Sequence, residues 1–120
     1  MDLVEQVAAS LKIASGKAEK GVGAILMALR MAVDRETFEA VRRELPNCES
    51  LMGRALMSGA RTGEMAALVG PAGLLAALAA AGYQKEDVPQ LGRIVLDHLR
   101  PTIGTDKVEQ FLAGAPALRG

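Results

Sequence analysis

Residues 16–31 read GKAEKGVGAILMALRM, and this stretch decides the fold. Val22, Ile25, Leu26 and Leu29 recur at spacings of three and four, the period of an α-helix with an apolar stripe. Glycines at 16, 21 and 23 suggest a phosphate-binding loop, but a preceding strand and a Lys-Ser/Thr ending are both missing. We therefore interpret them as small residues that allow close packing of the helix backbone.

The same helical period continues on both sides of this stretch. Strong helix formers dominate, β-branched residues are few, and no segment alternates as a strand would. We expect N-caps at Ser15, Asp34, Asn47 and Thr105. Pro46, Arg100-Pro101 and Gly114 are expected to end helices. The sequence predicts an all-α single domain over 1–120, a compact bundle of six to seven helices that include 2–11, 16–31, 35–45, 48–58, 71–81, 86–99 and 105–112.

The chain also matches itself without a gap at an offset of 70 residues. Ile25 falls on Val95, Leu29 on Leu99, and so on through three successive helices, although few positions are identical. The pattern predicts two related three-helix units, about 2–47 and 72–117, joined by residues 48–71. Each unit would cover the apolar face of the other. The alternative is that two unrelated stretches match because amphipathic helices look alike.

The order of these segments resembles a known family. It begins with SGKAEKGVGAILMAL at 15–29 and continues through Phe38, the Leu45-Pro46 break and an Ala/Gly/Leu-rich stretch at 70–80. AGYQKEDVPQL at 81–91 and IVLDHL at 94–99 follow. Over most of its length the chain is similar to the VcgC/VcgE-like family of bacterial proteins of unknown function. The resemblance implies an α-helical protein and supplies no catalytic residues. Residues 53–63 are more charged here than in the Gly-rich members.

Composition excludes several classes of function. The chain has 14 basic and 14 acidic residues, so no net field attracts it to nucleic acid or anionic lipid. One cysteine allows no internal disulfide, and with one histidine it cannot make a Cys/His zinc site. The first residues do not resemble a secretory signal, which favours a cytoplasmic location. The uncharged stretch 65–84 is long enough for a membrane span, but its alanines and Gly70-Pro71 favour a buried helix.

Two side chains are candidates for catalysis. His98 follows Asp97 near a helix end and could transfer protons near neutral pH. Cys48 stands at an expected helix start, where a thiol can become reactive. No motif places a partner beside either residue. We therefore interpret both as structural, predict that the protein is not an enzyme, and expect no cofactor or metal.

Charged residues gather on the predicted third helix and just before it. Arg42-Arg43 could contact phosphate, but interleaved carboxylates disfavour binding of nucleic acid. Glu39 and Arg43 stand at the spacing of an ion pair, and the face as a whole is expected to be solvated. The basic residues are Arg30, Arg35, Arg42 and Arg43, and the acidic ones are Asp34, Glu36, Glu39 and Glu44.

Methionine content is the feature that points most directly to function. Methionine is a flexible filler that is common on adaptable apolar surfaces. We therefore expect a non-enzymatic interaction module that binds itself or a protein partner through a Met/Leu/Ala-rich surface. The alternative is a carrier or sensor of an apolar small molecule held between the two units. The candidate surface comprises Met27, Met31, Leu51, Met52, Leu56, Met57, Met65 and Leu68.

Overall fold

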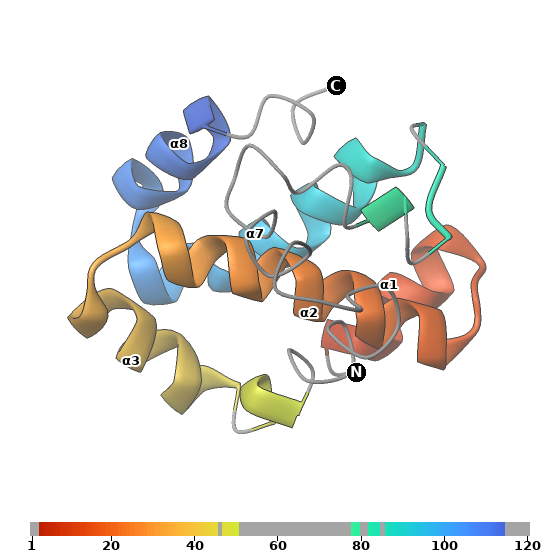
Figure 1. The fold of residues 1–120 in the computed structure, drawn as a ribbon, viewed down its shortest axis with the longest axis horizontal. Coiled ribbons are helices and arrows are strands. Elements are labelled where there is room, and N and C mark those ends of the chain that lie inside the picture. Colours follow the sequence, from red (N-terminus) through yellow and green to blue (C-terminus); the bar gives the residue numbers. More distant parts are fainter. Residues whose placement is uncertain (1–2, 46, 51–77, 80–81, 85, 115–120) are drawn as a thin grey trace.

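Two long helices, α2 (Ser15–Ala32) and α7 (Val88–Ile103), form the centre of the bundle (Figure 1). The computed structural model describes residues 3–45, 47–50, 78–79, 82–84 and 86–114. The helix α1 (Leu3–Leu11) packs on both central helices. On the other side of the bundle, α3 (Arg35–Glu44) packs on both, and α8 (Thr105–Gly114) packs on α7. Within the described ranges there are helices and no strands, which confirms the all-α fold.

The core follows from the composition of α2. A helix that is apolar around most of its circumference must be surrounded by other elements. In α2 every residue from Gly21 to Leu26 is buried, as are Ala28 and Leu29. The apolar stripe of α7 faces it with Val88, Leu91, Val95, Leu96, Leu99 and Ile103, all buried. Burial of each leucine or valine stabilises the fold by about 1.5–3 kcal/mol before entropy is subtracted.

The caps and ends of the helices differ in part from the sequence prediction. Asp34 caps α3 as expected, since its Oδ1 accepts a hydrogen bond from the Thr37 backbone N–H at 2.7 Å. The prediction was wrong for Ser15, which is already helical: Ala14 is the N-cap, and no side chain caps α2. Thr105 is likewise the first residue of α8 and not the residue before it. In both cases the preceding backbone takes the cap position without help from a side chain.

The prediction that Arg100-Pro101 ends the seventh helix was also wrong. The helix α7 continues through Pro101 to Ile103, and the Gly104 N–H bonds to the Arg100 carbonyl at 2.8 Å. Proline removes one backbone hydrogen bond and crowds the preceding turn. Here Pro101 is exposed at the last turn, and the extra turn buries Ile103 to 9% exposure. Burial of that side chain favours continuing the helix.

Several features recur 70 residues apart. The bounds of α3 and α8 coincide at this offset. The Ile13 N–H bonds to the Ala8 carbonyl and the Tyr83 N–H to the Leu78 carbonyl, each at 3.0 Å. In both places the residue between, Lys12 or Gly82, has a positive φ, of 56° and 98° respectively. This is the Schellman ending of a helix. These features agree with the predicted offset, while the relatedness of the two units stays a prediction, because the unit beginning near residue 72 is described only from Leu78.

The lysine at this ending supplies a stability test. A side chain in the left-handed region costs about 1 kcal/mol, and glycine avoids most of that cost. We expect Lys12→Gly to raise the free energy of unfolding by about 0.5–1 kcal/mol, because Lys12 is also exposed and packs on nothing. Urea unfolding followed by far-UV circular dichroism measures the change. The matched variant Gly82→Ala should lower stability, and a loss of stability in Lys12→Gly would contradict the argument.

Candidate functional site

A pocket of about 370 Å³ lies where the end of α2 meets α3. The C-terminal turn of α2 supplies Arg30, and its C-cap is Val33. One side of α3 supplies the rest of the lining, because residues at spacings of three, four and seven share a helix face. The described lining is Arg30, Val33, Arg35, Phe38, Glu39 and Arg42. The lining is mainly polar, with three guanidinium groups beside one aromatic ring.

Packing of α3 sets the position of these side chains. Phe38 and Val41 are buried and hold the helix against the core. Lys107 Nζ lies 3.5 Å from Asp34 Oδ2, so the cap of α3 is also tied to α8. The hydrogen bonds from Thr37 and the nearby charge of Lys107 hold the pKa of Asp34 below its ordinary value. The start of α3 is therefore fixed while Arg35 and Glu39 stay exposed.

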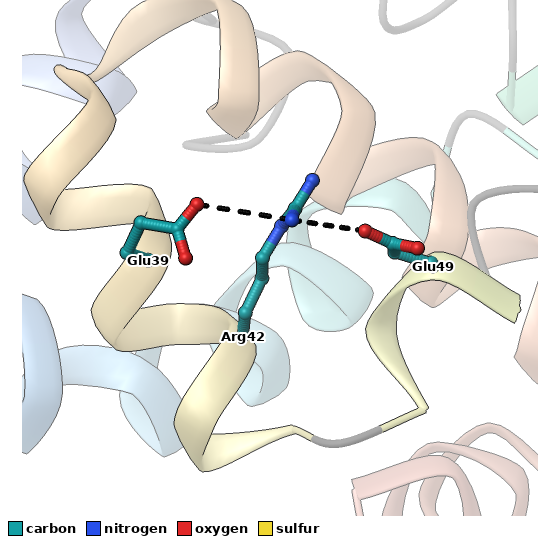
Figure 2. A network of polar contacts seen from close by, with 3 residues as sticks. All are labelled: Glu39, Arg42 and Glu49. Atoms are coloured by element: carbon teal, nitrogen blue, oxygen red, sulfur yellow. Dashed lines mark ion pairs between the residues drawn. The ribbon is translucent and has the colours of Figure 1, made fainter.

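Arg42 is the most strongly engaged of the three arginines. Its Nη1 lies 2.9 Å from Glu49 Oε1 and 3.7 Å from Glu39 Oε1, so it stands between two carboxylates (Figure 2). Its guanidinium carbon is 5.7 Å from the centre of the Phe38 ring, within reach of a cation–π interaction. Arg42 Nε is buried and has no hydrogen-bond partner. The group is thus held in place with part of its donor capacity unused.

Arg30 and Arg35 leave a surplus of positive charge at the pocket. Both side chains are exposed, and neither forms an ion pair with any residue in the described part of the chain. Three guanidinium groups therefore face the carboxylates of Glu39 and Glu49 alone. A guanidinium is always charged and presents a planar set of donors that suits carboxylate and phosphate groups. The arrangement can bind an anion.

The second half of the chain shows that the fold does not require this cluster. The positions 70 residues after the three arginines hold Arg100, Thr105 and Leu112. Arg100 pairs with Asp97 on its own helix at 3.4 Å, and Leu112 packs against the core. The helices α7 and α8 thus hold a similar helical pair together without two of the three charges. Arg35 and Arg42 are therefore better explained by binding than by folding.

The sequence recognised the arginines but not the pocket. It grouped Arg43 with them, whereas Arg43 does not line the pocket. It paired Glu39 with Arg43, and this was wrong, because Glu39 contacts Arg42 one residue earlier. It did not single out Phe38 or Glu49 as site residues. The alternation of arginines with a single aromatic at helical spacing was the available signal.

The predicted Met/Leu/Ala-rich surface is not brought together by the described residues. Met27 is partly buried and packs against the core. Met31 belongs to α2. The other six members, Leu51, Met52, Leu56, Met57, Met65 and Leu68, lie outside the described residues, so this surface stays a prediction.

The catalytic candidates stand apart from any reactive arrangement among the described residues. His98 is half-buried on α7. Cys48 is 1% exposed, and burial raises the pKa of its thiol, which the charges of Arg42 and Arg30 only partly oppose. A buried neutral thiol is a poor nucleophile. A search of the described residues finds no group of acidic, histidine or cysteine side chains that could hold a metal ion.

Comparison with known proteins gives a family and no function. In the described part of the chain no helix is long and apolar enough to cross a membrane. No curated protein and no solved structure matches the chain. A family model described as "Protein of unknown function VcgC/VcgE (DUF2780)" matches residues 1–95, which include α1, α2, α3 and the first half of α7. The chain therefore belongs to the VcgC/VcgE family of proteins of unknown function.

Proposed function

We propose that this protein is a non-enzymatic binding module that holds an anionic group of a protein partner in the pocket between α2 and α3. The observation that carries the proposal is the presence of three arginines around one pocket, two of them without an ion pair in the described ranges. Folding alone does not account for such a cluster, because like charges held close together repel one another. Binding of an anion would relieve that repulsion.

The character of the pocket also decides between ligand classes. An apolar small molecule would need a mainly apolar cavity with few polar groups. This pocket is mainly polar, and Val33 and Phe38 are its apolar lining residues. The pocket therefore favours an anionic group over the apolar ligand that the sequence offered as an alternative.

Thermal unfolding in inorganic phosphate tests the proposal. A ligand that binds only the folded state at ten times its Kd stabilises it by about 1.4 kcal/mol. We expect phosphate, at ionic strength held constant with chloride, to raise the melting temperature of the wild-type protein. The double variant Arg30→Gln/Arg35→Gln should lose this increase, because it removes the two unpaired charges.

A matched control separates the pocket from general charge. Arg93 is exposed on α7 and does not line the pocket. Arg93→Gln should keep the full increase in melting temperature with phosphate. An equal response of wild type, control and double variant would overturn the proposal.

A further inference from the structure

The pocket already contacts carboxylates of one kind, the side chains of glutamate. Glu49 and Glu39 both reach Arg42 Nη1, at 2.9 Å and 3.7 Å (Figure 2). The two side chains are 67% and 50% exposed, so water and salt screen these contacts, and they contribute little to stability. Such contacts exchange readily with carboxylates from outside. The internal pairs therefore show which chemistry the pocket accepts.

We propose that the partner group is a short acidic peptide segment whose carboxylates replace Glu39 and Glu49 on Arg42 and extend to Arg30 and Arg35. This inference rests on the proposed function and specifies its ligand. Val33 and Phe38 line the same pocket and give the methylene groups of a glutamate side chain an apolar surface. An inorganic anion would use only the charges and leave that surface bare.

The charges next to the pocket favour a peptide over a nucleic acid. Exposed carboxylates of Asp34, Glu36 and Glu44 flank the arginines along α3. A nucleic-acid backbone carries regularly spaced phosphates and is bound by an extended track of positive charge. The acidic residues interrupt any such track on α3. A pair of carboxylates needs only the pocket itself.

Fluorescence anisotropy with a labelled peptide tests the ligand class. The probe is a fluorescein-labelled Ala-Gly-Glu-Glu-Leu-Ala peptide, and its control carries Gln-Gln at the centre. We expect the Glu-Glu peptide to bind at least tenfold more tightly than the Gln-Gln peptide. Arg30→Gln should weaken binding of the Glu-Glu peptide about fivefold, whereas Arg93→Gln should leave it unchanged.

Removing the internal competitors gives the sharper test, because it predicts a gain. Glu39→Gln and Glu49→Gln should each tighten binding of the Glu-Glu peptide about threefold, since the peptide no longer displaces a carboxylate. Glu86→Gln, on an exposed residue outside the pocket, is the matched control. Far-UV circular dichroism checks that each variant keeps its helices. Unchanged or weaker binding in both Glu39→Gln and Glu49→Gln would contradict the exchange.

The outcomes separate this inference from the proposed function. If phosphate stabilises the protein through Arg30 and Arg35 but neither peptide binds, the anion pocket stands and the peptide ligand is wrong. If a single-stranded oligonucleotide binds more tightly than the Glu-Glu peptide with the same dependence on Arg30, the partner class is wrong. If the phosphate response is also absent, both proposals fail.

Discussion

Replacing Gly21 by alanine is expected to lower the free energy of unfolding by about 2 kcal/mol. A Cβ on Gly21 would lie 2.2 Å from the Tyr83 hydroxyl oxygen and 2.5 Å from the ring carbon that bears it. Tyr83 is 5% exposed, and its hydroxyl donates a hydrogen bond to the Lys17 carbonyl at 2.6 Å. The ring cannot turn aside without losing both its burial and that bond.

The sign of this effect depends on three contributions. Alanine favours a helix over glycine by about 1 kcal/mol, which opposes the loss. Crowding of a packed core costs about 1–3 kcal/mol, and the hydrogen bond contributes about 1 kcal/mol more. Burial also raises the pKa of Tyr83, so the phenol keeps its proton and remains a donor over the pH range of such measurements. The cost therefore exceeds the gain.

Gly16 on the same helix is the control. A Cβ there meets nothing within 4 Å, so Gly16→Ala should raise stability by about 0.5–1 kcal/mol. Urea unfolding followed by fluorescence of Tyr83, the single tyrosine in a chain without tryptophan, measures both variants. Tyr83→Leu in the Gly21→Ala background should recover part of the loss. Equal stabilisation by both alanines would show that the Tyr83 ring yields freely.

The second large effect is expected from the two central helices. Leu29→Ala and Leu99→Ala should each lower the free energy of unfolding by about 3 kcal/mol. Both side chains are 0% exposed, and they occupy positions 70 residues apart on α2 and α7. Each truncation removes buried apolar surface and leaves a cavity, because the surrounding side chains relax only in part. Urea unfolding curves give both values.

Leu112→Ala is the matched control for these truncations. Leu112 is only partly buried against the core, so its loss should be less than half as large. A loss below about 1 kcal/mol at Leu29 or at Leu99 would mean that the surroundings collapse around the missing side chain. That result would contradict the central position of α2 and α7 in the core.

Local patterns were sufficient to predict much of the fold. The stripe of Val22, Ile25, Leu26 and Leu29 places α2 correctly because burial follows the helical period. Asp34 was recognised as a cap because its short carboxylate can reach the backbone three residues on. Pro101 was misjudged, because the gain from burying Ile103 depends on the rest of the bundle, which local sequence does not show.

The candidate site required the fold as well as the sequence. The arginines were visible as a cluster, but Arg30 comes from α2 while Arg35 and Arg42 come from α3. The closing contact with Glu49 comes from beyond the end of α3. The angle between the helices creates the pocket, and packing of Phe38 and Val41 sets that angle. Sequence alone therefore indicated charge without indicating a cavity.

The fit of Tyr83 against Gly21 also restricts sliding of α2 along its axis. A shift of α2 by one helical turn would bring Lys17 or Ile25 towards the ring in place of a residue without a side chain. Neither leaves room for a buried phenol. The tyrosine thus acts as a key that admits a single register between segments more than sixty positions apart in the chain.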